Sequence, residues 1–350
     1  MSKSHNRTEL SELGEFGLID HLTGNLKLKN PAVIKGVGDD TAVIDIGDSY
    51  LLATKDLLIE GIHFDLTYTP LKHLGYKAVV MNLSDIAAMN GTPEQILIGL
   101  AVSNRYSVEA LSELYEGIYY ACERYKVDMV GGDTTSSPSG MFLSITALGR
   151  VDKDKVVYRS TSKVNDLVCV SGDLGGAYMG LLVLEREKSV FKNDPTMQPD
   201  LRGHDYILER QLKPEPRFDI LAELKKADIK PTAMIDISDG LASEILHICK
   251  NSKTGCNIYE DKIPIDTATA IMAEEFNIQP VTIAMNGGED YELLFTISLS
   301  DHDKIKNIKG VTVIGHITDE SSGVNLITRN GTAVQIQAQG WEHLRQKNRI

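Results

Sequence analysis

Two stretches of the chain have the apolar and polar pattern of a β-hairpin. In the first, the apolar runs 42–46 and 50–54 are joined by Gly47-Asp48-Ser49. In the second, Asn330-Gly331 lies between the runs 325–328 and 333–336, and this dipeptide is a type I′ turn signal. Further short apolar or β-branched runs predict strands at 96–102, 141–151, 167–170, 233–237, 291–297 and 311–314.

Helical spacing of apolar residues marks three other segments. Residues 71–89 carry one apolar stripe that includes Leu74, Ala78, Met81 and Ala88. Ser107 is the expected N-cap of a long helix through Tyr125. A glycine-rich turn at 172–176 introduces a helix to about residue 187, and the polar, proline-containing stretch 188–205 that follows predicts a surface excursion.

The polar stretch from residue 152 to 163 is the best candidate for a domain boundary. We therefore predict two domains, 1–158 and 159–350, because a chain of 350 residues usually folds as more than one. Strand and helix patterns alternate in both halves, and we find no internal repeat. The expected fold class is mixed α and β (α+β).

The chain is acidic. It has 36 Lys and Arg residues against 49 Asp and Glu residues, a formal charge of −13. Nucleic acid and anionic membranes repel such a chain, so we expect neither as a partner. If the substrate is phosphorylated, bound cations are expected to mediate the contact.

Cysteine usage and hydropathy favour a cytoplasmic protein. Cys122, Cys169, Cys249 and Cys256 form neither a CxxC pair nor a zinc-binding spacing, which is typical of reduced thiols. The first residues, Met1 to Arg7, lack the apolar core of a signal peptide. No run approaches the roughly 18 apolar residues of a membrane span.

Aspartates recur at predicted strand ends and in glycine-rich turns, next to apolar residues that should be buried. A single such aspartate is most simply a turn or capping residue, but a series of them repels itself unless cations are bound. Mg²⁺ suits such a series, since it takes one or two carboxylates and completes its shell with water and phosphate oxygens. The segments are Lys35-Gly-Val-Gly-Asp-Asp40, Thr54-Lys-Asp56, Asn82-Leu-Ser-Asp-Ile86, Gly131-Gly-Asp-Thr-Thr135, Asp236-Ile-Ser-Asp-Gly240 and Gly287-Gly-Glu-Asp-Tyr291.

Several standard nucleotide and metal motifs are excluded by the spacing. The sequence has no GxxxxGK[ST] loop, and Gly36-Val-Gly38 is followed by two aspartates that would repel a pyrophosphate. An EF-hand with Gly240 at its sixth position would have Ile235 and Ile237 where ligands belong. HExxH, GxSxG and the protein-kinase motifs are also absent.

In order, the motifs GVGDD, TKD, NLSDIAAM, GGDTT, DISDGL and GGEDYELLF resemble those of thiamine-monophosphate kinase, a member of the ATP-binding superfamily that includes aminoimidazole ribonucleotide synthetase. The resemblance extends from Gly14-Glu-Phe16 to Gly340-Trp-Glu-His343. It implies phosphorylation of thiamine monophosphate by ATP and Mg²⁺ to give thiamine diphosphate. It also implies a homodimer, in which the N-terminal sheets form a shared barrel and a C-terminal α/β domain completes the site.

The resemblance also implies roles for individual residues. We expect direct in-line transfer without a nucleophile from the protein, since the acceptor phosphate oxygen is already anionic. His63, Glu289 and Trp341 match residues that bind the acceptor. The residues that match magnesium ligands are Asp40, Thr54, Lys55, Asp56, Asp85, Asp133, Asp236 and Asp239, and those that match ATP contacts are Tyr115, Gly132, Asp133, Arg159 and Ser238.

One position departs from the family pattern. Lys55 stands where the family usually has a hydroxyl residue, so a side-chain metal ligand is lost there. Its backbone carbonyl remains available as a ligand, and its ammonium group is an alternative partner for an anionic oxygen. The departure concerns one metal position rather than the reaction.

Two other interpretations stay open on the sequence. The first is another enzyme of the same superfamily. Selenophosphate synthetase needs a reactive Cys or selenocysteine near the N-terminus, whereas the first cysteine here is Cys122. The hydrogenase-maturation relative uses a C-terminal cysteine, and this chain ends Asn348-Arg-Ile350. The second interpretation is a regulator that binds nucleotide and Mg²⁺ without catalysis.

Overall fold

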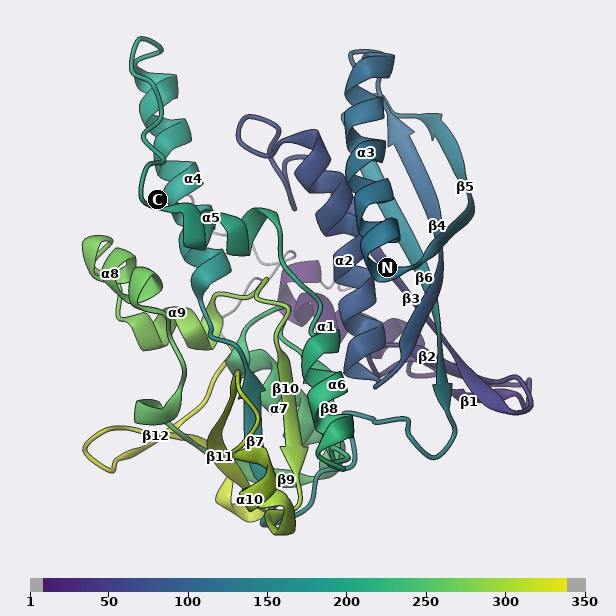
Figure 1. Ribbon diagram of the computed structural model, residues 1–350, viewed down its shortest axis with the longest axis vertical. Coiled ribbons are helices and arrows are strands. Elements are labelled where there is room, and N and C mark those ends of the chain that lie inside the picture. The colour runs from purple at the N-terminus through teal and green to yellow at the C-terminus, as the bar shows by residue number, and fades with distance from the viewer. Residues whose placement is uncertain (1–8, 339–350) are drawn as a thin grey trace, which may run out of the picture.

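In the computed structural model, which describes residues 9–338, the strands form two mixed sheets, one in each half of the chain (Figure 1). The first sheet has six strands in the order β1-β2-β3-β6-β4-β5, and the second has seven in the order β13-β12-β9-β11-β7-β10-β8. Helices pack against both sheets, so the predicted mixed α and β fold class is confirmed.

The first half contains the predicted N-terminal hairpin. Strands β2 and β3 pair in antiparallel register from Ala42 opposite Ala53 to Asp45 opposite Tyr50. Within this sheet β4 and β5 are parallel, and the other pairs are antiparallel. The elements are α1 (Leu10–Thr23), β1 (Val33–Lys35), β2 (Ala42–Asp45), β3 (Ser49–Ile59), α2 (Leu71–Ala88), β4 (Thr92–Val102), α3 (Val108–Tyr125), β5 (Asp128–Ser136) and β6 (Phe142–Asp152).

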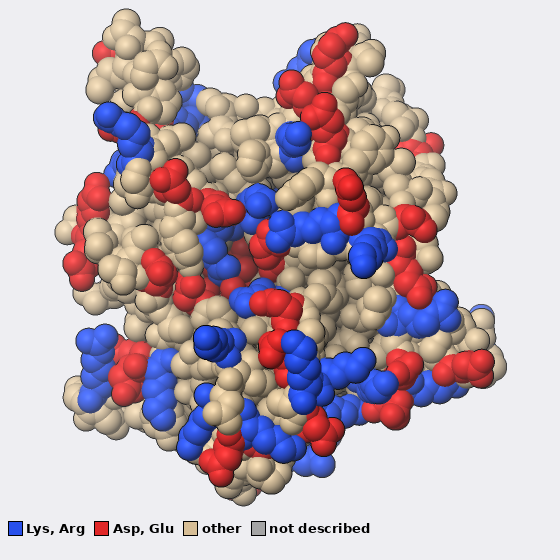
Figure 2. Space-filling view, in the orientation of Figure 1, with Lys and Arg blue, Asp and Glu red and all other residues tan. Residues whose placement is uncertain are grey.

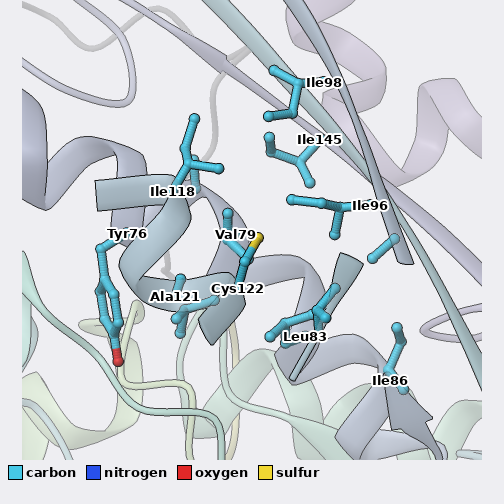
Figure 3. Close-up of a cluster of buried hydrophobic side chains, with 14 of the residues drawn as sticks. Tyr76, Val79, Leu83, Ile86, Ile96, Ile98, Ile118, Ala121, Cys122 and Ile145 are labelled. Carbon is cyan, nitrogen blue, oxygen red and sulfur yellow. The ribbon is translucent and has the colours of Figure 1, made fainter. Parts of the chain in front are cut away.

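Helices α2 and α3 pack closely together on one face of the first sheet. Val79, Leu83 and Ile86 of α2 lie among apolar side chains of α3 and of the sheet (Figure 3). Two glycines permit the close approach of the helices. A Cβ atom on Gly75 would lie 2.0 Å from the Leu114 carbonyl oxygen, and one on Gly117 would lie 1.8 Å from the Lys72 carbonyl oxygen.

The second half contains the predicted C-terminal hairpin, in which β12 and β13 are antiparallel with Ile327 opposite Ala333. In the second sheet β12 and β9 are parallel, and the remaining pairs are antiparallel. The elements are β7 (Leu167–Ser171), α4 (Gly176–Asn193), α5 (Asp205–Leu212), α6 (Phe218–Lys226), β8 (Ala233–Asp236), α7 (Leu241–Ser252), β9 (Thr254–Tyr259), η1 (Glu260–Lys262), α8 (Thr267–Glu275), α9 (Pro280–Asn286), β10 (Leu293–Ile297), η2 (Leu299–Asp301), α10 (His302–Ile305), β11 (Val311–Asp319), η3 (Glu320–Ser322), β12 (Val324–Ile327) and β13 (Ala333–Gln335).

Most predicted elements are present, with two instructive differences. Ser107 caps α3 as expected, because its Oγ accepts a hydrogen bond from the Ala110 N–H at 3.2 Å. Helix α4 extends to Asn193 rather than to about 187, so the irregular stretch begins later than predicted. Strand β5 was not predicted. Its two consecutive glycines suggest a turn, and only pairing with β4 makes it a strand.

The C-terminal end of α2 connects the two halves. Ala87 and Ala88 are fully buried in an apolar cluster with Val157, Cys169 and Met234 of the second half. This packing brings the last turns of α2 against the end of β8. Among the helices of residues 9–338, none is both long and apolar enough to cross a membrane.

Candidate active site

Three carboxylates from distant parts of the chain meet where the halves join. Asp40 precedes β2, Asp85 is in the last turns of α2, and Asp236 ends β8. One oxygen of each lies within 4.8 Å of an oxygen of the other two. The juxtaposition follows from the fold, because the packing of α2 against β8 carries Asp85 to Asp236.

Hydrogen bonds from neighbouring residues orient these carboxylates. Thr54 Oγ1 donates to Asp85 Oδ2 at 2.5 Å, and Ser84 Oγ donates to Asp236 Oδ2 at 2.6 Å. The backbone N–H of Asp56 donates to Asn82 Oδ1 at 3.1 Å, which fixes β3 against α2. Thr54 and Asp56 are alternate residues of β3 and therefore face α2 together.

The cluster carries more negative charge than its surroundings neutralise. Burial raises the pKa of Asp40 and Asp85 well above the ordinary value, and the other aspartates of the cluster raise both further. Burial, followed by repulsion from Asp236, raises the pKa of Asp56 to about 7. Arg159 partly offsets this charge, with a guanidinium nitrogen 2.5 Å from Asp40 Oδ1. Asp40 Oδ2 is buried and has no hydrogen-bond partner among the described residues.

A fourth aspartate lies on the loop that follows β8. Burial and the charges of Glu15 and Asp236 raise the pKa of Asp239 to about 6. Glu244, in the first turn of α7, accepts the Asp239 N–H at 2.8 Å and holds the loop in place. Ser238 lies between the two aspartates, with its hydroxyl 3.5 Å from Glu244 Oε1. The loop thus presents carboxylates, a hydroxyl and the N-terminus of α7, and helix N-termini bind anions.

Glu289 is attached to this loop by its backbone. Its N–H donates to the Ser238 carbonyl at 2.7 Å. Gly288 has φ +72°, and a Cβ there would lie 2.6 Å from the Ser238 oxygen, so the close approach requires glycine. The Glu289 carboxylate extends away to Lys77 Nζ, 3.1 Å from Oε1, and to Gln211 Nε2, 2.8 Å from Oε2.

His63 lies on the wall of a small cavity that also involves the partners of Glu289. Its Nδ1 accepts a hydrogen bond from the Ile59 N–H at 3.0 Å, which fixes the ring. The cavity is lined by Leu58, His63, Phe64, Tyr68, Thr69, Leu74, Lys77, Leu181, Gln211 and Leu212. His63 and Glu289, both predicted as acceptor residues, are therefore connected through Lys77 and Gln211.

The structure keeps Asp133 away from the three-carboxylate cluster. Asp133 lies on the edge strand β5 in a row with Gly99, Ser144 and Leu57, whereas Asp56 is in the neighbouring row with Ile145. Leu57 is 50% exposed and Ile145 is 1% exposed, so the two rows face opposite sides of the sheet. Gly132 is next to Asp133 on the same strand.

Lys55 and Tyr115 have other surroundings. Lys55 lies between Thr54 and Asp56 on β3, so its exposed side chain points to the face away from the cluster while its backbone stays beside it. Tyr115 is half-buried on α3, with its ring 5.9 Å from that of Tyr119. Trp341 lies outside the described residues.

Sequence reasoning missed Lys77, Ser84, Gln211 and Glu244. One signal was available for Lys77, since it precedes Met81 and Asp85 at successive intervals of four and so shares their stripe. Gln211 had no such signal, because its contact with Glu289 spans 78 residues.

Comparison with known proteins gives consistent matches. Residues 38–151 match the family model of AIR synthase related protein, N-terminal domain. The chain is 37% identical to a thiamine-monophosphate kinase of Buchnera aphidicola subsp. Schizaphis graminum, over 95% of this chain and 99% of that protein. It is 30% identical to the thiamine-monophosphate kinase of Bacillus subtilis, over 95% and 100%.

Solved structures agree with the sequence matches. A structure of AaThiL complexed with AMPPCP and TMP superposes with a TM-score of 0.81 at 30% identity, covering 97% of this chain and 99% of that one. Thiamine monophosphate kinase from Aquifex aeolicus gives 0.74 at 29% identity, covering 94% and 100%. The hydrogenase maturation protein HypE in complex with ATP gives 0.67 at 17% identity, covering 96% and 99%, which is a likeness of fold alone.

Proposed function

The chain belongs to the thiamine-monophosphate kinase family, and we propose that its carboxylate cluster is where it phosphorylates thiamine monophosphate with ATP. The similarity covers nearly the whole chain and both halves that build the cluster. The single observation that supports this location best is the convergence of Asp40, Asp85 and Asp236 from three distant segments. An acidic site of this kind holds a polyanionic nucleotide only if cations are bound between them.

We infer that these cations are Mg²⁺. The cluster fits the ion because its donors are hard carboxylate and hydroxyl oxygens and because Asp40 Oδ2 is buried without a partner among the described residues. Asp40, Asp85 and Asp236 would hold the ions, together with Thr54, Asp56, Asp239 and the Lys55 backbone carbonyl, and with Asp133 of a second copy of the chain. When bound, Mg²⁺ neutralises phosphate charge and aligns the reacting groups.

The chain's own residues then position the two phosphates for in-line transfer. The acceptor oxygen is already anionic, so no side chain acts as nucleophile or strong base. Arg159 offers a guanidinium group beside Asp40, and Ser238 offers a hydroxyl at the start of α7. We propose that both contact the nucleotide phosphates and that Gly132 and Tyr115 complete the ATP contacts. Orientation and charge stabilisation are the main sources of rate enhancement in such transfers.

We propose that thiamine monophosphate binds on the side of Glu289 and His63. Its cationic thiazolium suits the Glu289 carboxylate, and the cavity beside His63 is largely apolar. The indole of Trp341 would complete this acceptor site by stacking on a ring of the substrate.

A homodimer would explain why Asp133 lies away from the three-carboxylate cluster of its own chain. Leu57 and Leu97 are 50% and 36% exposed on the same face of the first sheet. An apolar face of this kind suits an isologous interface with a second copy, as in a shared barrel. Because Asp133 lies on the face of the sheet away from its own cluster, we propose that it serves the phosphate site of the second copy.

Other features support the remaining predictions. We propose a cytoplasmic enzyme, and the four cysteines are unpaired and buried. Nucleic acid and membrane are not proposed as partners, since the chain is strongly acidic. The two sheets occupy 33–152 and 167–335, which suits domains of 1–158 and 159–350.

A phosphoryl-transfer assay tests the proposed function. Thiamine, thiamine monophosphate and aminoimidazole ribonucleotide precursors are offered side by side with ATP and Mg²⁺. We expect ADP and thiamine diphosphate from thiamine monophosphate alone. Binding of ATP without product would instead favour a regulator, and product from another acceptor would favour a different enzyme of the superfamily.

A further inference from the structure

We propose that Lys77 is a positioning residue for the acceptor, which holds the carboxylate of Glu289 beside the small cavity lined by His63, Lys77 and Gln211 (the acceptor cavity) and thereby sets the affinity for thiamine monophosphate. This inference rests on the proposed function. Lys77, on α2, is not one of the residues that the sequence motifs assign to the site.

The surroundings of Lys77 are unusual for a lysine. Its side chain is 8% exposed, in a helix segment whose neighbours are buried and largely apolar. The ammonium group lies 3.1 Å from Glu289 Oε1 and 2.9 Å from the backbone oxygen of Gln211. Lysine is almost never buried unless it is paired, so these two contacts explain why the charge is tolerated.

Lys77 and Gln211 hold the Glu289 carboxylate from two sides. Lys77 contacts one oxygen, and Gln211 Nε2 donates to the other at 2.8 Å. The backbone of Glu289 is fixed separately, because its N–H donates to the Ser238 carbonyl on the loop that follows β8. The Glu289 side chain is 31% exposed, so it remains available to a ligand.

The position of Lys77 along α2 connects the acceptor cavity with the carboxylate cluster. Lys77 and Asp85 are eight residues apart on one stripe of the helix, roughly 12 Å along its axis. An acceptor whose ring lies beside Glu289 can thus extend its phosphate along α2 toward Asp85. Figure 2 shows basic and acidic side chains side by side in the hollow between α5 and α2.

Lys77 has two opposing effects on a cationic ligand. It adds a positive charge near the ring, which weakens binding, and it holds the carboxylate in place. Without this partner, the Glu289 carboxylate turns toward water, and the acceptor loses its counter-charge. We therefore expect the positioning effect to be the larger one.

Steady-state kinetics of the full chain test the inference with a matched control. Lys72 is on the same helix and makes an ion pair of the same length, 3.1 Å, with Glu116, but both side chains are more than half exposed. We expect Lys77→Met to raise KM for thiamine monophosphate about tenfold, from the loss of a hydrogen bond to a charged group. KM for ATP should be unchanged, Lys72→Met should match the unmodified enzyme, and Lys77→Arg should recover part of the affinity.

A double variant separates positioning from general stability. If Lys77 acts through Glu289, then Lys77→Met combined with Glu289→Gln should have the acceptor KM of Glu289→Gln alone. The double variant also removes both charges, so it avoids the unpaired carboxylate that could unfold Lys77→Met.

Three results would overturn the inference while leaving the proposed function intact. The first is an acceptor KM of Lys77→Met that equals that of Lys72→Met. The second is an acceptor KM of Lys77→Met below that of the unmodified enzyme. The third is a double variant whose acceptor KM exceeds that of Glu289→Gln alone. By contrast, an unmodified enzyme that does not phosphorylate thiamine monophosphate would refute the proposed function itself, and the role of Lys77 with it.

Discussion

The buried carboxylates of Asp56 and Asp239 make the stability of the metal-free fold depend on pH. Burial raises their pKa values to about 7 and about 6, compared with 3.8 for an ordinary aspartate. Between pH 4 and 7 the folded chain therefore holds protons that the unfolded chain has released. Stability falls with rising pH wherever the folded state binds more protons, so the metal-free protein should become less stable across this range.

Thermal unfolding in chelator at pH 5, 6, 7 and 8 measures this effect. We expect the Tm to decrease with rising pH, and Asp56→Asn to flatten the slope. Mg²⁺ should raise the Tm more at pH 8 than at pH 5, because it binds the deprotonated carboxylates. A Tm in chelator that increases steadily from pH 5 to 8 would contradict the assigned shifts.

Asp85→Asn should separate stability from activity. The substitution removes one of several repelling carboxylates, while an amide oxygen can still accept the hydrogen bond from Thr54. We expect the metal-free variant to unfold at the same or a higher temperature. Its kcat should fall by at least ~10²-fold, because a lost metal ligand removes several kcal/mol of transition-state stabilisation. A variant that kept its kcat would show that Asp85 is a structural residue.

Candidate site residues could be predicted where they belong to a short sequence motif. Each aspartate in a glycine-rich turn was a weak signal by itself, and it was the order of the motifs along the chain that pointed to the family. The partners that orient them were not recognisable, because Ser84 and Asp236 are 152 residues apart and only the fold brings them together.

At the level of elements, α2 is the part of the fold that the sequence predicts best and the site depends on most. Its apolar stripe predicted the helix, which spans Leu71–Ala88. The same helix carries Lys77, Ser84 and Asp85. Strand β5 shows the opposite case, since its glycines have low strand propensity and its existence depends on pairing with β4.

The close packing of α2 and α3 gives a prediction for stability. Gly117→Ala would place a Cβ atom 1.8 Å from the Lys72 carbonyl oxygen, so the helices must separate. We expect urea unfolding to show a loss of about 1–3 kcal/mol. Gly17→Ala in α1 is the matched control, because its new Cβ would make an ordinary contact at 3.5 Å. Equal free energies of unfolding for the two variants would show that the helices tolerate the extra volume.

At the level of the whole molecule, the site forms where the two halves meet, so neither half contains all of its residues. Asp40, Thr54 and Asp85 come from the first half, and Asp236, Asp239 and Glu289 come from the second. The polar stretch from residue 152 to 163 lies between the last strand of the first sheet, which ends at Asp152, and β7, which begins at Leu167. Periodicity could not show that α2 reaches across this division, since that contact depends on Ala87 and Ala88 packing against the second half.

The proposed homodimer predicts complementation between two inactive variants. Sedimentation at micromolar concentration should give a dimer. If Asp133 serves the site of the second copy, a mixed dimer of Asp133→Asn and Asp85→Asn chains has one intact site. Co-expression of the two should then restore activity to about a quarter of the unmodified level, since half of randomly formed dimers are mixed. A monomer, or no recovery on mixing, would contradict this arrangement.

The most direct test of the central claim is transfer of labelled γ-phosphate from ATP to thiamine monophosphate, measured for the unmodified enzyme and for Asp236→Asn with Mg²⁺ and with excess chelator. We expect the unmodified enzyme to form labelled thiamine diphosphate with Mg²⁺ and none in excess chelator, and a folded Asp236→Asn variant to form at least ~10²-fold less product with Mg²⁺. Full activity in chelator, or full activity of Asp236→Asn, would contradict the claim that the buried carboxylates are the site of phosphoryl transfer.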